Sequence, residues 1–152
     1  MAKIDTTISI LNNLIISSKE DEQGFARSAE DVQDLRIKEF FIRRSQKAAI
    51  CVAELQDLVD SLGGMPADAA TMSSRLHWKW MDLKNVISCN DKLAVLNKVE
   101  LEENKALNAY RQAAEKHLPS FIREVIVRQL DIVQDNYYEV VKLKNNLNVM
   151  AN

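Results

Sequence analysis

Apolar residues recur every three or four positions through most of the chain, and this spacing places them along one face of an α-helix. In the first long segment the stripe reads Ile4, Ile8, Leu11, Ile15, Phe25, Ala29 and Val32, and the same register adds Ser18 and Glu22. Four later segments show the same pattern. The chain is therefore expected to form helices over residues 6–32, 34–62, 72–88, 91–117 and 119–147.

Residues that stop or start helices stand at the boundaries of these segments. Gly63, with Pro66 close behind, ends the second segment, because glycine favours a helix C-terminus and proline cannot continue a helix. Asn90 and Asp91 supply a break and a new N-cap, and Pro119 suits the first turn of the last helix. The whole chain has only three glycines and two prolines, which favours a helical bundle over folds rich in turns.

The lengths of the links between segments predict a topology. The first and second segments, and the fourth and fifth, are separated by very short links, so each pair must form an antiparallel hairpin. About 28 residues separate the second and fourth segments, and a helix of about 16 residues within this link spans about 24 Å. A link of this reach predicts an all-α, ferritin-like four-helix bundle, with two hairpins joined by a long crossover that carries a short extra helix. A bundle with the crossover packed at one end is the competing arrangement.

Composition narrows the class of protein. Charged residues make up 28% of the 152 residues and leave a net charge of −2, which gives no general affinity for nucleic acid. Cys51 and Cys89 form no C-x-x-C pair, so two reduced thiols are expected. The N-terminus lacks the apolar region of a signal peptide, and no apolar run approaches the ~20 residues of a membrane span. We expect a cytoplasmic protein of one domain, with no nucleic-acid or membrane partner.

Polar residues on the inward stripes are the candidate functional residues. Helical register places six of them at comparable heights in the bundle: Ser18, Glu22, Arg44, Glu100, Glu103 and Gln129. Glu100 and Glu103 are three positions apart and share a face, whereas Glu102 is expected to be a surface charge.

A standard di-iron centre does not fit these positions. Such a centre needs a Glu-x-x-His pair from each of two helices. The two histidines, His77 and His117, are preceded at that spacing by Ser74 and Ala114, and Arg44 stands in the helix that should supply a pair. Arginine keeps its proton and cannot act as a ligand.

Two interpretations of the acidic positions remain. The favoured one is a buried polar layer in which Arg44 pairs with Glu22, Glu100 or Glu103, because buried charges must be paired. Three carboxylates face one arginine, however, so a carboxylate-only site of Glu22, Glu100 and Glu103 for iron, manganese or zinc is the alternative. The favoured interpretation predicts no cofactor.

The crossover segment "LHWKWMDLK" is rich in aromatic residues. Trp80 continues the apolar face and is expected in the core, whereas Trp78 lies off that face. His77 and Trp78 are therefore a possible interface for a homodimer or higher homo-oligomer. The chain has no phosphate-binding glycine loop, no Ser-His-Asp set and no nucleophilic cysteine with a base, so no enzyme class is indicated.

Four stretches, taken in order, resemble one known family. They are "ISILNNLIISSKEDEQGFARSAEDV", "AELQDLVDSLGGMPAD", "LHWKWMDLK" and "VELEENKALNAYRQAAEKHLP". The chain resembles the bacterial bundle proteins of domain of unknown function family 2383, over about residues 6–145. The resemblance implies a ferritin-like fold with no established catalytic activity, and it makes Glu22 and Glu103 the matching carboxylates of the first and third bundle helices.

These observations together predict a non-catalytic structural or protein-interaction bundle with an unidentified protein partner. A ferritin-like metal-binding protein that uses carboxylate ligands is the second hypothesis. The sequence neither supports nor opposes a stress-related role for such a metal-binding protein.

Overall fold

Five helices account for most of the chain in the computed structural model, which describes the backbone of residues 2–68 and 73–151 and the side chains of residues 3–68 and 80–147. The helices are α1 (Ala2–Asp31), α2 (Leu35–Ser61), α3 (Ser73–Ser88), α4 (Lys92–Ala114) and α5 (Ser120–Ala151). The described part of the chain contains no strand, and the all-α prediction is confirmed. None of its helices is long and apolar enough to cross a membrane.

Three helix ends lie three or four residues from the predicted ones, and the first of them is the start of α1, at Ala2 rather than Thr6. The fourth helix ends at Ala114 rather than His117, because the guanidinium of Arg123 donates hydrogen bonds to the Ala114 and Lys116 carbonyls and closes the turn between α4 and α5. The last helix continues to Ala151, four residues beyond the predicted end.

Aspartates start two of the bundle helices. Asp34 accepts a hydrogen bond from the Ile37 amide at 3.0 Å at the start of α2, and Asp91 accepts one from the Ala94 amide at 3.1 Å at the start of α4. Each side chain satisfies an amide that the helix itself leaves without a partner. At the other end of α2, Gly63 has a φ of 79°, a left-handed conformation that glycine adopts without strain.

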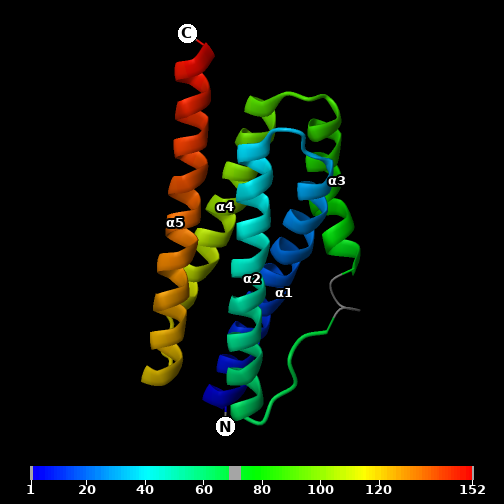
Figure 1. Ribbon diagram of the computed structural model, residues 1–152. Coiled ribbons are helices and arrows are strands. Elements are labelled where there is room, and N and C mark those ends of the chain that lie inside the picture. The colour runs from blue at the N-terminus through cyan, green and yellow to red at the C-terminus, as the bar shows by residue number, and fades with distance from the viewer. Residues whose placement is uncertain (1, 69–72, 152) are drawn as a thin grey trace.

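The helices form two antiparallel hairpins, α1–α2 and α4–α5, joined by a long crossover (Figure 1). Within the crossover, α3 packs against α1 and α4 along the side of the bundle. Asn12 on α1 holds the extended start of the crossover: its amide donates to the Met65 carbonyl at 3.0 Å, and its carbonyl accepts from the Ala67 amide at 2.9 Å. The ferritin-like topology is therefore confirmed, and the alternative with an end-packed crossover is wrong.

The buried apolar side chains fall into two clusters along the bundle axis. The aromatic cluster lies at the end where α2 and α4 begin and comprises Phe25, Ala29, Val32, Ile37, Phe40, Phe41, Trp80, Leu83, Ile87, Val95, Leu96, Val99 and Val140. The aliphatic cluster lies at the other end and comprises Leu11, Leu14, Ile15, Val52, Leu55, Val59, Ala106, Leu107, Tyr110, Ala113, Ile122, Ile126 and Val133.

Gly24 in the middle of α1 has a packing role. A glycine inside a helix costs roughly 1 kcal/mol relative to alanine. A Cβ atom on Gly24 would lie 1.7 Å from Cε2 of Trp80, so the indole of α3 rests directly on the α1 backbone. The glycine thus permits the close approach of the crossover helix to the bundle.

Candidate functional site: a buried polar layer

Polar side chains from all four bundle helices lie buried between or beside the two apolar clusters. They include Ser18, Glu20 and Asp21 on α1, Arg44 on α2, Glu102 and Glu103 on α4, and Gln129 and Asn136 on α5. Each is less than a tenth exposed. Buried polar groups need partners, because loss of hydration is otherwise uncompensated.

Arg44 is the centre of this layer. Its Nε donates to Oε2 of Glu103 at 2.7 Å, and its Nη2 donates to Oδ2 of Asp21 at 3.3 Å. Its Cζ also lies 5.2 Å from the centroid of the Phe25 ring, within the range of a cation–π contact. One guanidinium thus links α2 to both α1 and α4 and touches the aromatic cluster.

The surroundings of Arg44 keep it charged. Burial by itself would lower the pKa of Arg44, but the neighbouring carboxylates of Glu103 and Asp21 outweigh that effect and raise the pKa above its ordinary value. The layer therefore holds a permanent positive charge inside the bundle.

A second set of hydrogen bonds runs from the interior to the surface. The Tyr110 hydroxyl donates to Oε1 of Gln129 at 2.7 Å and lies 3.3 Å from the Ser18 hydroxyl. Gln129 in turn donates to Oε1 of Glu54 at 3.2 Å, and Glu54 pairs with Arg128 at the surface. Burial raises the pKa of Tyr110, whereas the hydrogen bonds from Arg128 lower the pKa of Glu54.

The structure places the six predicted layer residues in two groups. Ser18, Arg44, Glu103 and Gln129 are buried. The predictions for Glu22 and Glu100 are wrong. Glu22 is half-buried while its neighbour Asp21 contacts Arg44, and Glu100 is half-buried with its Oε2 2.5 Å from Nζ of Lys144, between α4 and α5.

Glu102, predicted to be a surface charge, is also buried. Its Oε1 lies 3.4 Å from Nζ of Lys105 and 3.8 Å from Nζ of Lys98, and Lys98 also pairs with Asp82 on α3. The crossover helix covers a second face of α4, so residues off the main stripe become buried. The sequence does contain a signal for burial of Glu102, namely Lys98 four residues before it and Lys105 three residues after it. Lysines at this spacing can neutralise a buried carboxylate on the same helix.

The remaining predicted residues are placed as follows. Trp80 is buried in the aromatic cluster, whereas the side chains of His77 and Trp78 lie outside the described ones, so their proposed interface role stays a prediction. Cys89 is exposed, and Cys51 is buried. Burial raises the pKa of the Cys51 thiol to about 11, against a lowering effect of Arg44.

The donor set does not fit a ferritin-like di-iron centre. Such centres take carboxylates and histidines from all four helices, projecting inward. Among the described residues, no three His, Cys, Asp or Glu side chains gather closely enough to hold a metal ion, and the Arg44 guanidinium lies between Asp21 and Glu103. The alternative set of Glu22, Glu100 and Glu103 is not brought together.

Comparison with known protein families identifies the family of this chain. Residues 6–116 match the family described as Domain of unknown function (DUF2383). The chain belongs to this family. The DUF2383 match runs from α1 to just past the end of α4 and leaves out α5, so it is shorter than the resemblance expected over residues 6–145. No curated protein matches the chain.

A solved structure has the same fold as this DUF2383 protein. It is the bacterioferritin-related protein from Bacteroides fragilis, described as a dodecameric thioferritin, with a TM-score of 0.78 and 14% sequence identity. The alignment covers 97% of this chain and 89% of the other. At this identity the likeness establishes a ferritin-like fold and nothing about chemistry.

Proposed function

We propose that this protein is a non-catalytic, homo-oligomeric bundle that serves as a structural or protein-interaction module. In this proposal the Asp21–Arg44–Glu103 layer takes the place of a di-iron site. The observation that carries it is the position of Arg44, whose two hydrogen bonds at 2.7 and 3.3 Å occupy carboxylates from α4 and α1.

The charge balance supports this function. A di-iron site neutralises its carboxylates with metal cations, whereas here a side chain of the protein does so. Arginine cannot lose its proton to make room for a cation. Ion pairs of this kind often add little net stability, but they can fix the register of helices and the choice of partner, which is useful in an assembly.

Two further observations bear on the oligomer. The bacterioferritin-related protein of the same fold is described as dodecameric. The described surface also carries exposed apolar side chains, including Ile50 on α2, which is 62% exposed. We propose a cytoplasmic homo-oligomer that can also receive a protein partner.

Elemental analysis of protein purified without chelators tests the non-metal function. We expect less than stoichiometric iron, manganese or zinc. Stoichiometric metal that is lost in Glu103→Gln would overturn the proposal. Glu100→Gln is the matched control, because the same change is made on the same helix but outside the layer.

The second candidate is a ferritin-like metal-binding protein that uses carboxylates, and the fold it shares with the bacterioferritin-related protein favours it. It requires Arg44 to leave Glu103 and Asp21 when metal binds. Retention of metal in wild-type protein, together with a metal-dependent rise in thermal stability that Glu103→Gln abolishes, would establish this function.

A further inference from the structure

An elongated groove lies between α1 and α4 at the aliphatic end of the bundle. It consists of two adjoining hollows of about 190 and 250 Å³, which share Ile10 and Lys116. Apolar side chains of Ile10 and Leu14 line the first hollow from α1, and the small side chains of Ala109 and Ala113 line it from α4. Small residues on one wall leave room for a side chain from another molecule.

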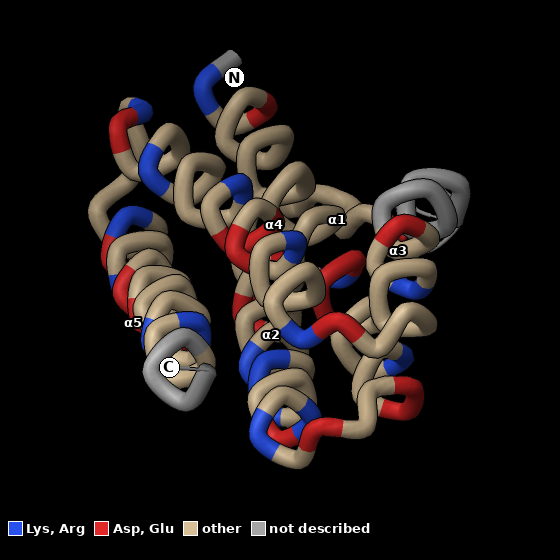
Figure 2. The backbone as a smooth tube through the Cα atoms, turned by 90° about the horizontal axis from the view of Figure 1, so that it is seen from above, with Lys and Arg blue, Asp and Glu red and all other residues tan. Residues whose placement is uncertain are grey.

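The second hollow is basic. Lys3 on α1 lines it together with Lys116 and His117, which follow α4. No acidic side chain among the described residues lines either hollow. Elsewhere, acidic and basic positions are interspersed along the helices, as Figure 2 shows. The groove therefore fits an occupant that is apolar at one end and acidic at the other.

The outer face of α2 on this same chain has that chemistry. Five of its exposed residues follow a four-three spacing: Gln46, Ile50, Ala53, Asp57 and Asp60. This spacing keeps them on one face, on which Gln46, Ile50 and Ala53 carry no charge and Asp57 and Asp60 are carboxylates. Ile50 is the large apolar side chain on this stripe and is 62% exposed.

The distance along the helix from the apolar part to the charged part is the same for the groove and for the stripe. On α1, seven residues separate Ile10 in the apolar hollow from Lys3 in the basic one, a rise of about 10 Å along the helix. On α2, seven residues separate Ile50 from Asp57, which gives the same rise of about 10 Å. When Ile50 enters the apolar hollow, Asp57 can therefore reach the basic hollow.

We infer that the α1–α4 groove receives the Ile50–Asp60 stripe of a second copy of this chain. Ile50 acts as a knob in the hole formed by Ile10, Leu14, Ala109 and Ala113. Asp57 and Asp60 then pair with Lys3 and Lys116. This inference rests on the proposed homo-oligomer and adds the surfaces that build it.

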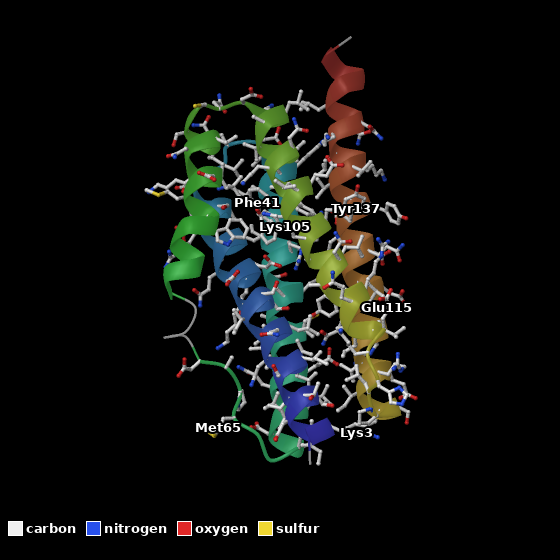
Figure 3. All side chains as sticks on the ribbon, turned by 180° about the vertical axis from the view of Figure 1, so that it is seen from behind. Lys3, Phe41, Met65, Lys105, Glu115 and Tyr137 are labelled. Atoms are coloured by element: carbon white, nitrogen blue, oxygen red, sulfur yellow. The ribbon has the colours of Figure 1, made fainter. Side chains whose placement is uncertain are left out.

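The two surfaces lie on different sides of the molecule. The α2 helix is in front in Figure 1, whereas α1 and α4 are in front in Figure 3, where Lys3 lies at the lower end. A contact between unlike surfaces is heterologous, and it closes only as a ring of three or more copies or continues as a filament. The contact thus cannot end at a dimer.

Charge reversal with light scattering tests the inference. Lys3→Glu/Lys116→Glu alters the groove, and Asp57→Lys/Asp60→Lys alters the stripe. We expect wild-type protein to form particles of at least three times 17.3 kDa at micromolar concentration. Each double variant should raise the concentration needed for half-assembly by about tenfold or more, because like charges then face each other. The combination of all four changes should restore assembly.

The controls use α5, which carries neither surface. Asp131→Lys and Lys142→Glu reverse exposed charges there and should leave assembly unchanged. Circular dichroism checks that every variant remains helical. A monomeric wild-type protein would defeat the proposed oligomer itself. An assembly that ends at a dimer, or that both double variants leave intact, would overturn this inference while the proposed oligomer stands.

Discussion

The aromatic and aliphatic clusters both contain side chains from the four bundle helices, but the kinds of side chain and the part played by α3 differ. In the aromatic cluster, the Phe25 ring lies 5.4 Å from Phe41 and 5.0 Å from Trp80, centroid to centroid, and α3 closes the cluster from outside. The described aliphatic cluster takes no residue from α3 and is built mainly from branched aliphatic side chains of α1, α2, α4 and α5, together with Ala106, Ala113 and Tyr110. The comparison shows that the part of the crossover helix whose side chains are described, residues 80–88, extends the core at the aromatic end.

The polar layer joins these unlike halves. Arg44 contacts the Phe25 ring of the aromatic cluster, and Tyr110 of the aliphatic cluster donates its hydroxyl to Gln129. Hydrogen bonds depend more strongly on distance and angle than apolar contacts do. We therefore propose that the layer sets the axial position of each helix relative to its neighbours.

Removing Arg44 should lower the free energy of unfolding more than any other single substitution proposed for this chain. Arg44→Ala leaves the carboxylates of Asp21 and Glu103 buried without their cation, and breaking such a pair costs about 3–5 kcal/mol. Urea denaturation at pH 7 measures the loss.

The control for this prediction removes all three charges together. Arg44→Met/Asp21→Leu/Glu103→Leu should be within about 1 kcal/mol of the wild type or more stable, because no charge remains buried. If Arg44→Ala alone costs less than about 1 kcal/mol, the layer does not hold the two halves in register.

The fold could be predicted from the sequence because its determinants are local. Asp34, Gly63 and Asp91 mark helix ends through their own hydrogen bonds or backbone conformation. The long link between α2 and α4 then leaves few topologies. These features do not depend on which other residues a side chain meets.

The polar layer was predicted only in part, because it depends on rotation about each helix axis. Asp21 and Glu22 are adjacent and point about 100° apart, so a small error in register exchanges them. Glu102 is buried because α3 covers a second face of α4, and a single apolar stripe does not reveal a second buried face. The partners of buried carboxylates emerge only from tertiary packing.

The two cysteines allow a second comparison, between the interior of the protein at Cys51 and its surface at Cys89. The pKa of Cys51 is raised from 9.0 to about 11 by burial, so the folded protein keeps a proton that the unfolded chain releases. This contribution to stability is fully present below pH 9 and is lost as the pH rises through 11. The free energy of unfolding should fall by up to about 3 kcal/mol over that window.

Substitution separates the two cysteines. Cys51→Ala should flatten the alkaline decline that begins at pH 9, whereas Cys89→Ala should not, because Cys89 is exposed. In native protein a thiol reagent should modify Cys89 and spare Cys51. Equal rates of modification would show that the interior opens easily around Cys51.

Glycine substitutions compare the two ends directly. Gly24→Ala places a Cβ atom 1.7 Å from the Trp80 ring, so it should destabilise by about 1–2 kcal/mol although alanine is the better helix former. Gly64→Ala meets the flexible tip of Ile8 at 2.8 Å and should cost less. Urea denaturation measures both.

A second substitution identifies the cause of the Gly24 effect. Trp80→Leu removes the ring that the new Cβ atom meets, so the combined variant Gly24→Ala/Trp80→Leu should be more stable than the sum of the single changes predicts. Strict additivity would mean that the indole moves aside freely, and the aromatic end would then be no more tightly packed than the aliphatic end.

The helix caps supply the smallest expected effect, and both side-chain N-caps described, Asp34 and Asp91, lie at the aromatic end. Burial would raise the pKa of Asp34, but the hydrogen bond from Ile37 and the ion pair with Lys92 outweigh it and lower the pKa. Asp34→Ala should cost about 1 kcal/mol at pH 7. The charged cap stabilises above the ordinary pKa of 3.8 and is lost as the pH falls through the lowered value.

Asparagine in place of Asp34 tests the charge apart from the hydrogen bond. Asp34→Asn keeps an oxygen that can accept from the Ile37 amide but loses the attraction to Lys92, 3.0 Å away in the wild type. At pH 7 it should lie between the wild type and Asp34→Ala in urea denaturation. As the pH falls below 3.8 and through the lowered pKa, the wild type should approach the asparagine variant, because its carboxylate becomes protonated. A difference between wild type and Asp34→Asn that stays the same throughout this acid titration would mean that the cap acts through geometry alone.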